Sequence, residues 1–219
     1  MIIYHSSLER SEGLKILSRI GLVESGFLSY YYIQDRSKFD LRSYRSILTR
    51  IIVDSGAHSF FSLLQGAGLS ASVHTRDATK VDTDPESYFQ RYLAWLLKNE
   101  SLLDYFVELD IGEIVGQKRV LEWREILSRN GLIKKCITVY HPAVVSLKEY
   151  HKMVAESESR YVALEGIRAG RPRLPYTSLI EIAFRLDVKV HGFALTNRKV
   201  LDASPFFSVD SSRWVACSG

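Results

Sequence analysis

Carboxylates that end apolar runs are the residues of this 219-residue chain with the clearest capacity for chemistry. Asp54 ends one such run, Asp210 ends another much later in the chain, and Asp110 follows a third. A buried parallel strand typically looks like this, with its last residues delivered to a polar rim. Because a carboxylate beside an apolar core must be hydrogen-bonded, paired or functional, three of them together favour a catalytic site over three separate helix caps.

Histidines follow several of the same runs and raise a second kind of chemistry. His5, His141 and His191, together with Asp210, could hold the metal of a barrel hydrolase. Such enzymes usually carry a His-x-His pair on their first strand, and position 3 of this chain is Ile. We therefore expect a site without a metal, and the metal-dependent barrel hydrolase remains an alternative.

Short apolar runs that recur along the chain are the predicted strands, with helical periodicity between most of them. They lie at 2–4, 27–33, 51–53, 105–109, 136–140, 161–164, 188–193 and 206–209. Alternating strands and helices imply parallel pairing through right-handed crossovers, and this number of strands closes a (β/α)₈ TIM barrel. An open doubly wound sheet is the main alternative, although no Gly-rich phosphate loop follows the first run.

We predict that residues 1–219 form a single barrel domain of the α/β class. Only ten residues follow position 209, too few for a final helix. Either the barrel lacks that helix, or the chain is a shortened version of a longer protein. Two helix starts are also predicted, because Asp84 precedes Pro85 and because Ser146 and Glu149 have the spacing of a capping box.

The composition is that of an ordinary globular protein with a small excess of positive charge. Hydrophobic residues make up 46% of the chain and aromatic residues 11%, which suffices for a core. No apolar run approaches the roughly 20 residues needed to cross a bilayer, and the N-terminus has no apolar core of a secretory signal. We expect a cytoplasmic protein without membrane contact. The net charge of +4 permits a polyanionic partner but does not require one.

An ordered series of short motifs resembles the tRNA-guanine transglycosylases. Asp54-Ser55-Gly56-Ala57 is similar to the Asp-Ser-Gly-Gly signature of that family, and Ser208-Val209-Asp210 falls where the family has its nucleophilic Asp. The motifs between them follow the order of the family's base-recognition segments: Glu108-Leu109-Asp110, Tyr140-His141-Pro142, Ala163-Leu164-Glu165-Gly166 and His191-Gly192-Phe193-Ala194. The resemblance covers nearly the whole chain. It is closer to the shorter relatives in phages and bacteria that place 7-deazaguanine bases in DNA.

The resemblance implies a base exchange in which guanine in DNA or tRNA is replaced by a 7-deazaguanine base, such as 7-cyano-7-deazaguanine. It assigns to Asp210 the attack on C1′ of the nucleoside, and to Asp54 the acid and base catalysis that serves the leaving and entering bases. Such a pair needs one ionised carboxylate and one with a raised pKa. Asp110 would read the Watson–Crick edge of the purine.

Further residues are implied in binding by the same resemblance. The base pocket would include Ser55, Gly56, His141, Glu165, Gly166, His191 and Gly192, whose glycines allow a close approach to the flat base. His141 and Glu165 depart from the family, which has Gln and Gly there. The target base must leave its stack, and the phosphates beside it would contact a basic set, namely Arg168, Arg171, Arg173, Arg198, Lys199 and Arg213.

The structural zinc site of the family is not expected in this chain. That site uses a Cys-x-Cys-x-x-Cys cluster with a later His, whereas this sequence has only two cysteines. We therefore expect no cofactor. The protein could act as a homodimer or with a partner subunit, and a non-catalytic nucleic-acid-binding partner of a transglycosylase remains an alternative function.

Overall fold

Eight parallel strands form a closed barrel, which confirms the predicted fold class. The computed structural model describes residues 1–9, 19, 24–34, 36, 39–64, 83–142, 144–166 and 175–212. Each strand pairs with the next in chain order, and β8 pairs with β1, so the open-sheet alternative is wrong. The strands are β1 (Ile2–Ser6), β2 (Ser25–Ser29), β3 (Arg50–Asp54), β4 (Tyr105–Val107), β5 (Cys136–Tyr140), β6 (Tyr161–Leu164), β7 (Lys189–Gly192) and β8 (Ser208–Ser211).

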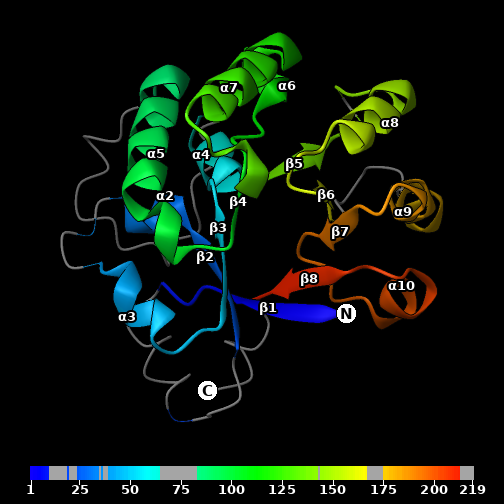
Figure 1. Cartoon of the computed structure of the whole chain (residues 1–219), viewed down its shortest axis with the longest axis horizontal. Helices are drawn as coiled ribbons and strands as arrows, with labels where there is room; N and C mark the ends of the chain where they lie inside the picture. Colours follow the sequence, from blue (N-terminus) through cyan, green and yellow to red (C-terminus); the bar gives the residue numbers. More distant parts are fainter. Residues whose placement is uncertain are drawn as a thin grey trace.

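Helices lie around the outside of the ring of strands (Figure 1). They are α2 (Tyr30–Ile33), α3 (Leu41–Arg45), α4 (Ala57–Leu64), α5 (Pro85–Asn99), α6 (Gly112–Val115), α7 (Gln117–Arg129), α8 (Leu147–Ala155), α9 (Tyr176–Arg185) and α10 (Arg198–Ala203), with the 3₁₀ helices η2 (Glu100–Leu102) and η3 (Ile133–Lys135). None of the helices among the described residues is long and apolar enough to span a membrane. The prediction about a final helix concerns residues 213–219, which lie outside the described residues.

Both predicted helix starts are confirmed. The Asp84 side chain accepts a hydrogen bond from the Ser87 backbone N–H at 2.8 Å, and Pro85 opens α5. At the start of α8, the side chains of Ser146 and Glu149 bond reciprocally to each other's backbone N–H. These contacts satisfy N–H groups that have no partner within the helix, which is why the local sequence identifies the start.

The predicted strand over 27–33 is only half correct. β2 ends at Ser29, and the following residues form the short helix α2. Tyrosines favour strands locally, but the ring of Tyr30 packs against Tyr88, Tyr92 and Trp95 of α5, with centroid separations of 5.5, 4.8 and 5.8 Å. Packing between elements therefore overrides the local preference.

Alternate residues of each strand point into the barrel, and this alternation decides which side chains reach its mouth. On β3, Ile51 and Val53 belong to the outer core, whereas Ile52 belongs to a cluster inside the barrel. Asp54 follows Ile52 by two residues and so faces inward at the end of the strand. Asp210 also faces inward, because its neighbour Val209 belongs to the outer core. The inner cluster consists of Tyr4, Phe27, Ile52, Val107, Ile137, Val139, Tyr161 and Ala163.

Candidate active site

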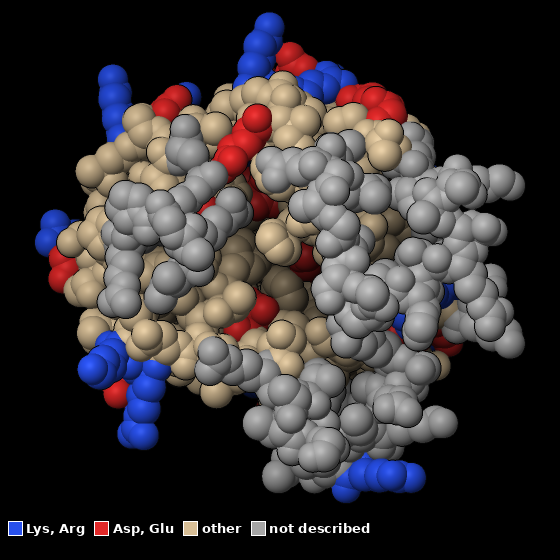
Figure 2. Space-filling model, turned by 180° about the vertical axis from the view of Figure 1, so that it is seen from behind, with Lys and Arg blue, Asp and Glu red and all other residues tan. Residues whose placement is uncertain are grey.

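A cavity of about 510 Å³ lies at the C-terminal ends of the strands. Figure 2 shows it as a hollow with acidic side chains at its base and the Lys and Arg side chains of this face near the periphery. Its volume falls within the roughly 300–1,000 Å³ typical of small-molecule sites. The cavity lining includes the three predicted aspartates together with His141, Glu165 and Gly166, and most of the other walls are apolar, from Phe27, Ala57, Phe61, Ile111, Phe193 and Ala194.

Asp54 is held at the mouth of the barrel by the turn that follows β3. The Gly56 backbone N–H donates to Asp54 Oδ2 at 3.0 Å. Gly56 has φ +79, and a Cβ at this position would lie 2.4 Å from Tyr31 Cβ, so both the backbone conformation and the close packing require glycine. The hydrogen bond from this turn therefore fixes the orientation of the Asp54 carboxyl group, which lines the cavity.

The environment of Asp54 favours its protonated form. Burial and the nearby charge of Asp110 raise the pKa of Asp54 from 3.8 to about 8, and the charge of Asp210 adds to this effect. The hydrogen bond from Gly56 opposes the shift but does not cancel it. At neutral pH Asp54 therefore carries a proton that it can donate.

Asp210 has the opposite electrostatic environment in the same cavity. Its Oδ1 accepts the Ala194 backbone N–H at 2.7 Å, and its Oδ2 accepts the Ser6 hydroxyl at 2.7 Å. His191 Nε2 lies 3.4 Å from Asp210 Oδ1. Burial alone would raise the pKa of Asp210, but His191, the Ala194 N–H and the Ser6 hydroxyl outweigh burial and lower it. Asp210 is therefore an ionised carboxylate at neutral pH.

A loop in an unusual conformation supplies one of these donors. Ala194 has φ 49, in the left-handed region, which costs a residue with a Cβ roughly 1–2 kcal/mol. The preceding carbonyl, that of Phe193, would lie 2.3 Å from a Cβ at Gly166, so the loops after β6 and β7 touch through their backbones. Gly166 is thus needed to bring the Ala194 loop over the cavity.

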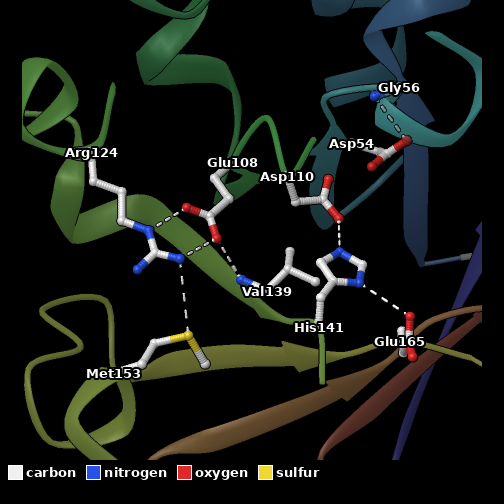
Figure 3. A network of polar contacts seen from close by, with 9 residues as sticks. All are labelled: Asp54, Gly56, Glu108, Asp110, Arg124, Val139, His141, Met153 and Glu165. Atoms are coloured by element: carbon white, nitrogen blue, oxygen red, sulfur yellow. Dashed lines mark hydrogen bonds and ion pairs between the residues drawn. The ribbon is translucent and has the colours of Figure 1, made fainter. Parts of the chain in front are cut away.

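His141 lies between two carboxylates on another side of the cavity, as Figure 3 shows. Its Nε2 is 2.6 Å from Asp110 Oδ2, and its Nδ1 is 3.1 Å from Glu165 Oε2. Burial alone would lower the pKa of His141, but the hydrogen bonds to Asp110 and Glu165 outweigh burial and raise it to about 10. His141 is therefore an imidazolium that donates both of its N–H groups, one to each carboxylate.

Glu108, which adjoins this group in sequence, faces away from the cavity. It forms a buried ion pair with Arg124, with Oε2 2.5 Å from Arg124 Nε, and it accepts the Val139 backbone N–H at 2.7 Å. These contacts join β5 and α7 to the segment that follows β4 (Figure 3). Glu108 thus fixes the segment after β4 that carries Asp110.

The remaining predicted pocket residues lie close to the cavity without lining it. The Ser55 side chain is fully buried, and the Ser55 carbonyl accepts the Tyr88 hydroxyl at 2.6 Å. A Cβ at Gly192 would meet Leu195 and Phe206 in the outer core, so this glycine faces away from the cavity. The ring of His191 is fully buried and contacts Asp210.

The predicted phosphate-binding residues can be placed only in part. Arg198 and Lys199 begin α10 and are exposed. Arg198 makes an exposed ion pair with Asp202, with its Nε 3.5 Å from Asp202 Oδ2. Arg168, Arg171, Arg173 and Arg213 lie outside the described residues.

Several groups that contribute to the site were missed by the sequence interpretation, Ser6, Phe27 and Phe61 among them. Ser6 donates to Asp210, while Phe27 and Phe61 line the cavity. The alternation along β1 could have identified Ser6, since it follows the inward Tyr4 by two residues. Phe61 lies on α4, where the sequence gives no signal that distinguishes a cavity wall from ordinary core packing.

Two of the candidate ligands of the alternative metal site, His191 and Asp210, are neighbours, but the four do not form one cluster. His5, His141, His191 and Asp210 are all described, and no group of three or more His, Cys, Asp or Glu side chains among the described residues could hold a metal ion. No protein-family model matches the chain, and the search of curated proteins found no match. The functional interpretation therefore rests on the motifs and on the geometry of the cavity.

Proposed function

We propose that this protein is a base-exchange transglycosylase that replaces guanine in DNA or tRNA with a 7-deazaguanine base. The observation that carries the proposal is that two carboxylates with opposite electrostatic environments, Asp54 and Asp210, line one cavity. The pKa of Asp54 is raised to about 8, whereas the pKa of Asp210 is lowered. A pair of this kind supplies an acid and a nucleophile at the same pH, as a double displacement at a sugar carbon requires.

In the first displacement, Asp210 attacks C1′ of the target nucleoside. A bond forms between a carboxylate oxygen and C1′, and the bond between C1′ and the guanine nitrogen breaks. Asp54 gives its proton to the departing base, which leaves as neutral guanine. The product is a glycosyl ester on Asp210, and Asp54 is left as a carboxylate.

In the second displacement, the incoming base takes the reverse path. Asp54 accepts the proton of the ring nitrogen that will form the new bond, and that nitrogen attacks C1′. The ester bond breaks and releases the Asp210 carboxylate. Two inversions restore the original configuration, and the sugar–phosphate backbone is never cut.

The group formed by Asp110, His141 and Glu165 is suited to recognising the exchanged base. His141 occupies Asp110 Oδ2, and Asp110 Oδ1 has no partner among the described residues, so it can accept an N–H from the purine edge. Because His141 is held by carboxylates on both sides, it keeps Asp110 in a fixed orientation. The flat apolar walls, including Phe61 and Phe193, are suited to the faces of a purine ring.

The target nucleotide must be extruded from its stack to place C1′ beside Asp210. The exposed residues Arg198 and Lys199 on α10 are suited to contact the phosphates of such a strand. The extruded nucleotide enters a cavity whose polar lining residues are mostly acidic. This acidity favours the positive charge that develops on the sugar during displacement.

The test is incorporation of radiolabelled guanine into DNA and tRNA, with denaturing gels to detect the covalent adduct. We expect Asp210→Asn to abolish both incorporation and adduct, because an amide is a far poorer nucleophile. Glu125→Gln, a carboxylate-to-amide change at an exposed residue of α7 that forms an ion pair with Arg129, is the control and should behave as wild type. Exchange at the wild-type rate by Asp210→Asn would refute the proposal.

A further inference from the structure

A buried chain of polar side chains lies beneath Asp210 inside the barrel. Tyr161, His191 and Ser208 come from β6, β7 and β8, and each has 0% of its surface exposed. The hydroxyls of Tyr161 and Ser208 are in contact, and the Ser208 hydroxyl lies 2.6 Å from His191 Nδ1. His191 Nε2 faces Asp210 Oδ1. Buried polar groups destabilise a barrel core unless they are connected, and this chain ends on the candidate nucleophile.

The imidazole ring of His191 cannot turn freely in this position. It stacks on Phe27 with a centroid separation of 5.3 Å and an interplanar angle of 5°. The rings of Tyr4 and Phe193 pack edge-on against it at 6.2 and 5.1 Å. The two ring nitrogens therefore keep their separate neighbours, Ser208 at Nδ1 and Asp210 at Nε2.

The donor and the acceptor in each hydrogen bond of this chain follow from which hydroxyl group has to donate its proton. Burial raises the pKa of Tyr161 well above its usual range, so the phenol keeps its proton and needs an acceptor. Ser208 Oγ is the acceptor that the described residues offer to it. Ser208 must then donate its own proton to His191 Nδ1, which accepts it, and the ring proton is on Nε2.

We propose that Tyr161 and Ser208 are positioning residues that hold His191 as a neutral ring with its proton on Nε2, so that Asp210 meets a hydrogen-bond donor. This inference rests on the proposed role of Asp210 as the nucleophile. The opposite tautomer would turn a nitrogen lone pair toward the carboxylate. A neutral ring favours the ionised form of Asp210 by donating its Nε2–H, as the Ala194 N–H and the Ser6 hydroxyl do. A doubly protonated ring would add an ion pair with Asp210 and make its oxygens less available for attack on C1′.

The contact between His191 and Asp210 is loose in the absence of substrate. The separation of 3.4 Å is long, and Nε2 makes no well-aligned hydrogen bond within the described part of the chain. Catalytic hydrogen bonds are often long in the free enzyme and tighten in the reacting complex. The other titratable groups around the ring, among the described residues, are the Tyr4 phenol from β1 and the Tyr161 phenol from β6, and both keep their protons because burial raises their pKa, that of Tyr4 to about 12.

Nitrogen-15 NMR of the ring of His191 tests the assignment without any substrate. We expect the wild-type protein at neutral pH to carry a proton on Nε2 and none on Nδ1. Tyr161→Phe removes the hydroxyl group that donates to Ser208, so Ser208 no longer has to donate to Nδ1 of His191. Ser208 can then accept a hydrogen bond from Nδ1, and a doubly protonated ring should become populated. Tyr150→Phe is the matched control, because it also removes a buried tyrosine hydroxyl, bonded to the Leu179 carbonyl at 2.9 Å.

A proton on Nδ1 in the wild type, or a Tyr161→Phe spectrum identical to that of wild type, would overturn the inference. The catalytic consequence is measured as the rate of adduct formation, which Tyr161→Phe should lower by about 10–100-fold, by analogy with the loss of a partner that orients a metal-binding histidine. An unchanged rate would overturn the positioning role. If the wild-type protein forms no adduct, the proposed function fails, while the NMR result still decides the hydrogen-bond assignment.

Discussion

Replacement of Asp54 with Asn is expected to stabilise the folded protein at neutral pH. Asn has the shape of a protonated Asp, and its Oδ1 can continue to accept the Gly56 N–H. In the folded protein, burial and the charge of Asp110 raise the pKa of Asp54 from 3.8 to about 8. At pH 7 the folded state therefore holds a proton that the unfolded state releases. This costs stability, and an amide avoids the cost because it does not ionise.

The magnitude follows from the linkage of protonation to folding. The stability contributed by neutral Asp54 is full below pH 3.8, and it is lost as pH rises toward the folded pKa of about 8. One pH unit corresponds to about 1.4 kcal/mol, and pH 7 lies about three pH units above the ordinary pKa, which gives about 4 kcal/mol. Because Asp54 is partly exposed to the cavity, solvent reduces this value. We expect a gain of about 2–4 kcal/mol at pH 7 and about half of that or less at pH 5.

Urea unfolding of wild type and Asp54→Asn at pH 5, 6 and 7 measures this gain. Asp210→Asn is the informative comparison, because its carboxylate is stabilised by His191, Ala194 and Ser6, and the lowered pKa predicts a loss of stability at pH 7. The same chemical change should thus have opposite signs at the two positions. A loss of stability in Asp54→Asn at pH 7, or a gain that does not grow with pH, would show that Asp54 is not held in its neutral form.

Three further outcomes follow from the site. Asp54→Asn should slow guanine exchange by about 10²–10⁴-fold, the range for a lost general acid, while gel-shift assays show unchanged nucleic-acid binding. In wild type, adduct formation should fall about tenfold between pH 7 and pH 9, because Asp54, with its pKa of about 8, loses its proton; a flat profile in rapid-quench measurements would contradict this. Gly166→Ala should lower the free energy of unfolding by about 1–3 kcal/mol, since its Cβ would lie 2.3 Å from the Phe193 carbonyl oxygen, and equal urea midpoints for variant and wild type would count against that contact.

The barrel and the positions of its carboxylates could be predicted because they depend on local patterns. Eight apolar runs separated by helices favour the closed barrel that the structure shows, and a two-residue alternation places Asp54 and Asp210 on the inner side. The contact between His141 and two carboxylates could not be predicted, because it depends on how the loops after β4, β5 and β6 bend. His191 was expected in the base pocket, and whether its ring lies in the cavity or beneath Asp210 depends on the stagger of the strands, which sequence does not specify.

The hydrogen bond between Ser6 and Asp210 joins the first and last strands of the barrel across 204 positions of the chain. On a ribosome that adds about 5–20 residues per second, Ser6 is made some 10–40 seconds before Asp210. During this time β1 has one edge without its final neighbour, and exposed strand edges pair readily with other chains. The carboxylate proposed to attack DNA or tRNA thus gains its Ser6 donor only when the ring closes, whereas the Ala194 N–H comes from the loop after the neighbouring strand β7. An open ring would therefore leave this carboxylate without one of its hydrogen-bond donors, and closure of the barrel is the step that completes its environment.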